Sequence, residues 1–133
     1  MSMFHKTLDV ITLFHKASSP ASRNIYAILK KASEKSSSVS TQSHRIPREQ
    51  FELEITEELP TRYQLRSILE YAGAPNTSKI IKGAKDEKEA WKMIEANSEN
   101  FQRPLIVDWA RGRVTSQTNE SDILKMIYSE HKT

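Results

Sequence analysis

The chain has 133 residues, of which 37% are hydrophobic and 28% are charged, and its formal net charge is +3. This composition is typical of one globular domain, and no apolar run reaches the roughly 18 residues that a membrane-spanning helix needs. The 20 basic and 17 acidic residues form no block of like charge, so the sequence predicts neither membrane nor nucleic-acid binding. The chain has no cysteine, which excludes thiol–disulfide exchange by its own side chains.

A buried strand followed by a helix is predicted near the start of the chain. The run from Val10 to Phe14 is short, apolar and rich in β-branched residues, which favours a central strand buried on both faces. Ser18 and Ser19 then offer a hydroxyl N-cap, and Pro20 suits the first helical position. The apolar residues that follow at helical spacing are Ile25, Ile28, Leu29 and Ala32.

The next segment, from Glu34 to Arg48, is rich in serine and has no apolar period. Such a segment buries too little surface to offset its conformational entropy, so we predict a flexible insertion there. After it, Phe51, Leu53 and Ile55 alternate with glutamates, which predicts a strand with one exposed face at or near a sheet edge.

Two amphipathic helices are predicted in the middle of the chain. Thr61 and Gln64 have the spacing of a capping box, and the pattern behind them predicts a helix from Arg62 to Ala72 that Gly73 ends. A further helix is predicted between Asp86 and Asn97, with acidic residues in its first turn and one apolar face.

A hairpin and a closing helix complete the pattern. The run Leu105 to Trp109 predicts a strand, and Ala110 to Gly112 forms a short turn before a strand at Arg113 to Thr115. Asn119 or Ser121 can cap a last helix. This order of elements predicts an α/β fold in which a central four-stranded mixed sheet is flanked by helices on both faces. Trp91 and Trp109 are expected to pack against its core.

Several motifs resemble those of arsenate-reductase-like proteins, in the same order along the chain. The segment from His15 to Asn24 resembles the family loop His-Asn-Pro-x-Cys-x-x-Ser-Arg. The run Leu105 to Trp109 is more similar to fungal mitochondrial redox proteins of the same branch. The other matching segments are Pro60-Thr61-Arg62 with Leu65, Ile80-Ile81-Lys82, Arg103-Pro104-Leu105-Ile106-Val107 and Asp122-Ile123-Leu124.

This resemblance implies a thioredoxin-like fold for residues 1–133 as a single domain, with the insertion at about 34–48. It also implies a mitochondrial location. The segment from Met1 to Leu8 carries His5 and Lys6 but no arginine-rich run, so a cytoplasmic location is the alternative.

The resemblance places the family's reactive cysteine at the N-terminus of the first helix, where this chain has Ser19. A helix N-terminus lowers the pKa of a thiol, but a serine hydroxyl lacks the redox chemistry of sulfur. We therefore favour a plain helix N-cap at Ser19 over a nucleophile.

The same resemblance implies a binding surface around this helix. Arg23, Lys82 and Arg103 match positions that contact an anion, although each can equally be a solvated surface charge. Pro104 is expected to follow a cis peptide bond and to expose neighbouring backbone to an extended peptide or to glutathione. Ser116 stands where the family has a further arginine.

Histidine chemistry is not expected. His15 ends the first strand, but no nucleophile or carboxylate is placed by the sequence to complete a triad, so a structural histidine is favoured. The other histidines are His5, His44 and His131, and none of the four has metal-ligand spacing. The sequence therefore predicts neither a metal nor a cofactor.

Two functions remain open from the sequence. The first is a mitochondrial redox protein that reduces small molecules, with the thiol nucleophile absent from this chain. The second is a catalytically silent thioredoxin-fold module that binds a small anion, glutathione or an extended peptide. The sequence does not specify the oligomeric state.

Overall fold

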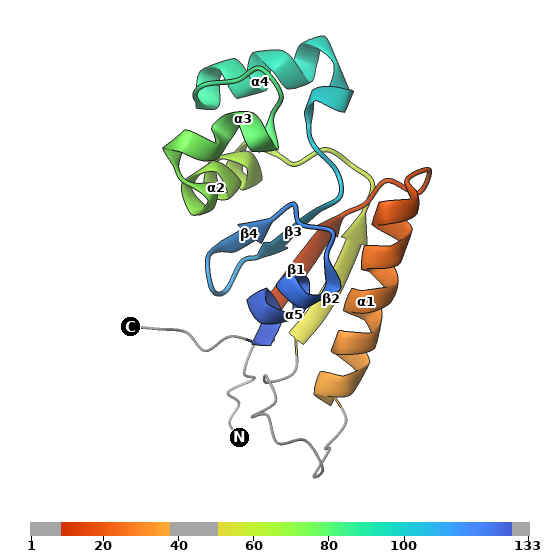
Figure 1. The fold of residues 1–133 in the computed structure, drawn as a ribbon. Helices are drawn as coiled ribbons and strands as arrows, with labels where there is room; N and C mark the ends of the chain where they lie inside the picture. The colour runs from red at the N-terminus through yellow and green to blue at the C-terminus, as the bar shows by residue number, and fades with distance from the viewer. Residues whose placement is uncertain (1–8, 38–50, 129–133) are drawn as a thin grey trace, which may run out of the picture.

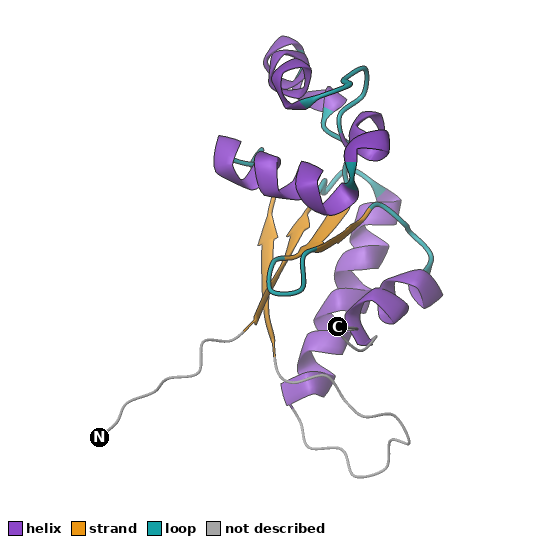
Figure 2. Ribbon diagram, turned by 90° about the vertical axis from the view of Figure 1, so that its left-hand side faces the viewer, coloured by secondary structure: helices purple, strands orange, loops and turns teal. Residues whose placement is uncertain are grey.

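The computed structural model describes residues 9–37 and 51–128, which form a four-stranded mixed sheet with helices on either side (Figures 1 and 2). The strands lie in the order β2-β1-β3-β4. Strands β1 and β2 are parallel, whereas β3 is antiparallel to both β1 and β4. The predicted central position of β1 and edge position of β2 are confirmed. The strand bounds are β1 (Asp9–Phe14), β2 (Phe51–Thr56), β3 (Leu105–Asp108) and β4 (Arg113–Thr115).

The predicted helices are present, and their ends coincide with capping residues. Thr61 and Gln64 form the predicted capping box of α2, in which Gln64 N–H donates to Thr61 Oγ1 at 3.1 Å. Asp86 accepts from Glu89 N–H at the start of α4. The short α3 was not predicted, because four residues cannot display a helical period. The helical segments are α1 (Pro20–Ser37), α2 (Arg62–Ala72), η1 (Ala74–Asn76), α3 (Thr77–Ile80), α4 (Glu87–Ala96), η2 (Ser98–Asn100) and α5 (Glu120–Tyr128).

The length of α1 corrects the predicted boundary of the serine-rich insertion. The helix runs to Ser37, so residues 34–37 are helical rather than part of a loop. Once a helix is nucleated, each further residue adds one hydrogen bond, and no apolar side chain is needed to extend the last turn. The rest of the predicted insertion lies outside the described residues, as do the segment 1–8, His44 and His131.

One face of the sheet packs against α1 and α5 (Figure 1). Burying an aliphatic side chain of this size stabilises the folded state by about 1.5–3 kcal/mol, so this layer holds α1 firmly on the sheet. Its buried core consists of Ile11, Leu13, Phe51 and Ile106 from the strands, Ile25, Leu29 and Ala32 from α1, and Ile123 and Ile127 from α5.

The other face packs against α2, α3 and α4. Phe14 and Phe101 form the centre of this layer, with ring centroids 5.4 Å apart in an edge-to-face arrangement. Trp91 and Trp109 are partly buried and pack against the same cluster, as predicted. Because successive β1 residues point to opposite faces, both layers fix the register of this strand.

The strand register brings three chain segments together at one end of the sheet. Phe14, the last residue of β1, pairs with Thr56 at the end of β2 and with Leu105 at the start of β3. The loop that enters α1 therefore meets the residues that follow β2 and precede β3. His15 N–H extends this arrangement by donating to the carbonyl of Thr56 at 2.7 Å.

Candidate functional site

Ser19 lies immediately before α1 and caps its first turn. Its Oγ accepts from Ser22 N–H at 3.2 Å, and its carbonyl accepts from Arg23 N–H at 3.0 Å. Its own N–H donates to the carbonyl of Lys16 at 2.9 Å, which closes the turn ahead of the helix. The hydroxyl thus satisfies one of the backbone donors that a helix start leaves unpaired.

A buried pair fastens this loop to α1. His15 Nδ1 and Ser22 Oγ are 2.6 Å apart, and Ser22 Oγ also accepts from Lys16 N–H at 3.0 Å. Since the hydroxyl already accepts one bond, its proton is available for His15 Nδ1. The imidazole packs edge-on against Tyr26, with centroids 5.5 Å apart. His15 is therefore a structural histidine, as predicted.

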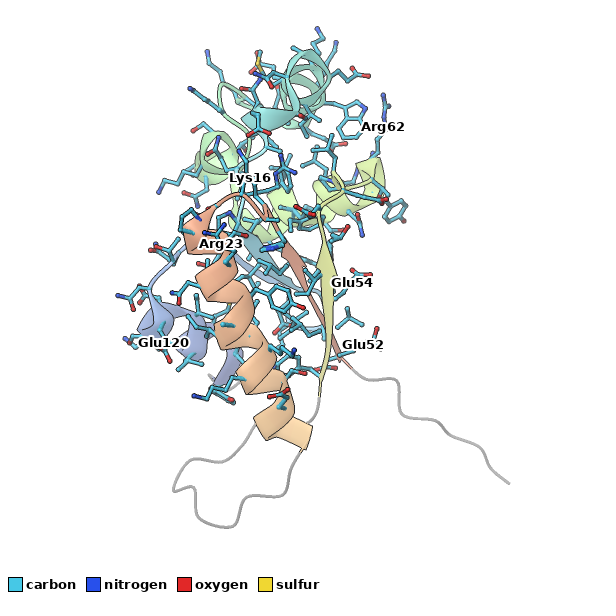
Figure 3. The ribbon with its side chains drawn as sticks, turned by 90° about the vertical axis from the view of Figure 1, so that its right-hand side faces the viewer. Lys16, Arg23, Glu52, Glu54, Arg62 and Glu120 are labelled. Carbon is cyan, nitrogen blue, oxygen red and sulfur yellow. The ribbon has the colours of Figure 1, made fainter. Side chains whose placement is uncertain are left out.

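Arg23 holds the loop from the helix side. Its Nη1 donates to the carbonyl of Ala17 at 2.7 Å, while Ala17 N–H donates to Glu57 Oε1 at 2.9 Å. Arg23 and Lys16 both lie beside the start of α1 (Figure 3). The guanidinium thus contacts the chain's own backbone, at a position where the sequence suggested a contact to an anion.

Glu99, which the sequence analysis did not single out, joins two cations at this end of the sheet. Its Oε1 accepts from Lys16 Nζ, and its Oε2 accepts from Arg103 Nη2 at 3.0 Å. Arg103 Nη1 also donates to the carbonyl of Glu57 at 3.2 Å. The Arg103 side chain is only 11% exposed, and its buried Nε has no partner among the described residues.

The electrostatics of Glu99 follow from these contacts. The hydrogen bond and charge of Lys16, followed by the charge of Arg103, hold the pKa of the Glu99 carboxyl below its ordinary value of 4.5. A carboxylate therefore already lies between the two cations at neutral pH, where an external anion would otherwise bind.

This lowered pKa predicts how stability depends on pH. The ionised Glu99 stabilises the folded state above 4.5, and the contribution is lost as the pH falls through the lower pKa of the folded state. The urea midpoint of Glu99→Gln should lie below that of the wild type at neutral pH, and the gap should close in acid. Glu120→Gln, which changes an exposed residue at the start of α5, is the matched control. A gap that widened in acid would contradict the assigned ion pairs.

Lys82 contributes no side-chain contact to this cluster. Its backbone N–H donates to the carbonyl of Asn100 at 2.8 Å, which ties the segment after α3 to the last residue of η2. Its ammonium group is exposed and has no hydrogen bond or ion pair within the described chain. Ser116 follows β4 and is likewise exposed.

The segment before β3 presents backbone polar groups beside the α1 loop. The Arg103–Pro104 peptide bond is cis, which confirms the prediction, and Pro104 is buried. Among the described residues, no hydrogen bond engages the backbone N–H or C=O of Arg103. These two groups are available to a ligand that lies alongside the chain in an extended conformation.

Other ligand classes have less support in residues 9–37 and 51–128. No three histidine, aspartate or glutamate side chains there gather closely enough to hold a metal ion. No helix of that part combines the length and apolar character needed to cross a bilayer.

The fold and the site thus describe an α/β protein in which a capped helix, two cations and a carboxylate meet at the end of a mixed sheet. The chain belongs to the family described as "Protein of unknown function (DUF1687)", whose sequence profile matches residues 1–117. No solved structure matches the chain significantly.

One relative carries a functional name. A Schizosaccharomyces pombe protein, "Putative redox protein fmp46, mitochondrial", is 29% identical to this chain over 65 residues. The matched region covers 49% of this chain and 54% of that protein, so the chain spans about half the length of this relative.

Proposed function

We propose that the chain is a single thioredoxin-like domain of the arsenate-reductase-like branch, and that it binds a glutathione-like thiol between the α1 loop and Arg103. Its order of elements and the strand order β2-β1-β3-β4, with β1 and β2 parallel, support the fold. The redox name of the S. pombe relative supports a redox role and a mitochondrial location.

The main support for the proposed ligand is that the backbone N–H and C=O of Arg103 have no hydrogen-bond partner among the described residues. Glutathione is a short peptide, and an extended peptide binds best where a backbone N–H and C=O are both unpaired. Because Leu105 pairs with the last residue of β1, these groups lie next to the loop that ends in Ser19. The start of α1 then offers the positive end of a helix to a ligand thiolate.

The absence of cysteine determines what such a site can do. This chain cannot form a mixed disulfide itself, so the sulfur that reacts has to belong to the ligand. Ser19 serves as the cap that orients the first turn of α1, rather than as a nucleophile. The proposed role is therefore to hold a thiol chiefly through the Arg103 backbone, while the carboxylates of the ligand compete with Glu99 for Lys16 and Arg103.

A bare oxyanion fits this surface less well. Glu99 is paired with both Lys16 and Arg103 and offsets one of their two charges, and Arg23 is engaged by a backbone carbonyl. A phosphate would also need free N–H groups in the loop, but those of Ala17, Ser19 and Ser22 donate hydrogen bonds to acceptors of the chain itself. Phosphate, arsenate or sulfate would thus have to displace an internal carboxylate without gaining a peptide backbone contact.

A thermal-shift titration tests the proposed ligand. At one hundred times its dissociation constant, glutathione should stabilise the protein by about 2.7 kcal/mol and raise Tm accordingly. S-methylglutathione should bind more weakly because it cannot form a thiolate. Phosphate, arsenate and sulfate at the same concentration should leave Tm unchanged. A shift with phosphate equal to that with glutathione would contradict the proposal.

Two variants locate the binding. Lys16→Gln should weaken glutathione binding, whereas Lys79→Gln, an exposed lysine on α3, should not. Glu99→Gln should tighten it about threefold, because the change removes the internal carboxylate that competes for Lys16 and Arg103. If neither Lys16→Gln nor Glu99→Gln changes the affinity for glutathione, the ligand binds elsewhere and the assignment is wrong.

A further inference from the structure

A pocket lies between the start of α2 and α4, and none of its lining residues belongs to the α1 loop. Its volume is about 480 Å³, which is within the range of small-molecule sites. From α2 it is lined by Arg62 and Leu65, and from α4 by the face that carries Trp91.

Trp91 and Arg62 pack against each other at one wall of this pocket. The guanidinium carbon of Arg62 lies 5.1 Å from the centre of the indole ring. Trp91 packs on the core beneath, together with the buried Leu65. Arg62 reaches from the start of α2 toward α4 (Figure 3) and has no hydrogen-bond acceptor among the described residues. A stacked guanidinium keeps its N–H groups available for a carboxylate or phosphate.

Two lysines complete the cationic side of the pocket. Lys88 and Lys92 are four residues apart on α4 and flank Trp91 on one helical face. Both are exposed, and neither has an ion-pair partner in the described part of the chain. Like charges at this spacing repel each other on a helix surface, and a bound anion would relieve that repulsion.

The acidic residues of the pocket do not offset these cations fully. Glu87 is paired with Arg66, which lies outside the pocket, at 3.4 Å. Glu95 is the remaining acidic residue of the lining, and it lies three residues along α4 from Lys92 without an ion pair in the described part of the chain. Arg62, Lys88 and Lys92 therefore leave an excess of positive charge beside an aromatic wall.

We propose that this pocket binds a small phosphate monoester that carries a planar ring, the chemistry of a nucleoside monophosphate. The phosphate would be held by Arg62 and the two lysines, because three cations match a doubly charged group better than a single carboxylate. The ring would stack on the face of the Arg62 guanidinium that points away from Trp91, so that Trp91 supports the guanidinium from beneath. This site is independent of the thiol site proposed at α1.

Isothermal titration calorimetry with adenosine monophosphate tests this site on the intact chain. Adenosine and inorganic phosphate, titrated separately, should each bind at least about tenfold more weakly, because adenosine lacks the phosphate group and inorganic phosphate lacks the ring. Equal affinity for inorganic phosphate would overturn the role of the ring. Equal affinity for adenosine would overturn the role of the cations, and no binding of adenosine monophosphate at millimolar concentration would overturn the site.

Charge-removing variants identify the binding residues. Arg62→Gln should weaken binding of adenosine monophosphate about tenfold, and Lys88→Gln and Lys92→Gln about threefold each. Lys125→Gln, which removes an exposed lysine from α5 on the opposite face, is the matched control and should leave binding unchanged. Unchanged Tm values would show that each variant is folded. Binding that survives in all three pocket variants contradicts the proposal.

Discussion

Ser19→Cys should produce a thiol with a pKa of about 7, below the value of about 8.5 for an unperturbed cysteine. The side chain would sit immediately before α1, within reach of Ser22 N–H and at the positive end of the helix dipole. Lys16 contributes positive charge nearby, but Glu99 neutralises part of it. The backbone of α1 is therefore the main cause of the expected shift.

The measurement is the rate of alkylation as a function of pH. At neutral pH this thiol should react about threefold faster than an ordinary one, because its larger thiolate fraction outweighs its lower intrinsic nucleophilicity. Ser116→Cys places a thiol on an exposed residue after β4 and is the matched control. If both variants show the same inflection, the start of α1 does not stabilise a thiolate, and the thiol site proposed there is wrong.

Much of the fold was predictable because its signals are local. Capping residues such as Thr61 and Asp86 mark helix starts through contacts with residues three positions away. Apolar and polar residues alternate in β2, which indicates one buried face. The continuous apolar runs of β1 and β3 indicate strands that are buried on both faces. The end of α1 was misplaced because it has no such local signal. Its last turn has neither an apolar period nor a helix-ending residue.

The site was only partly predictable because its contacts are long-range. Ser19 could be placed from its position before Pro20, since an N-cap is a local motif. Glu99 is 83 residues from Lys16, and nothing in the spacing of charges indicates that they meet. Glu57 is similarly 40 residues from Ala17. A signal was available for only one of these contacts, the four-residue separation of Glu99 from Arg103.

These long-range contacts also change the interpretation of the cations. The sequence presented Arg23 and Arg103 as candidate anion ligands, and both are engaged by oxygen atoms of the chain itself. The carboxylate of Glu99 already occupies the space between Lys16 and Arg103, which favours a ligand bound through its backbone over a bare oxyanion. The recognition proposed at α1 therefore depends on Arg103 more through its main chain than through its guanidinium.

Ser22→Ala should destabilise the protein by about 2 kcal/mol, although it removes a single oxygen atom. Ser22 is fully buried, and its hydroxyl serves both His15 Nδ1 and Lys16 N–H. Its loss leaves two polar groups without a partner in a site with little access to water, and each such group costs about 1–3 kcal/mol. The better helix propensity of alanine recovers only a few tenths of a kcal/mol.

Urea denaturation measures this loss, with Ser67→Ala as a matched control because Ser67 lies on α2 and its hydroxyl makes no hydrogen bond with the described residues. The control should change the free energy of unfolding by less than about 0.5 kcal/mol. Adding His15→Leu to Ser22→Ala should cost less than the sum of the single changes, since each removes the other's unpaired group. Strict additivity would mean that His15 and Ser22 do not stabilise each other, and that the loop before α1 is held by Arg23 and Glu57 alone.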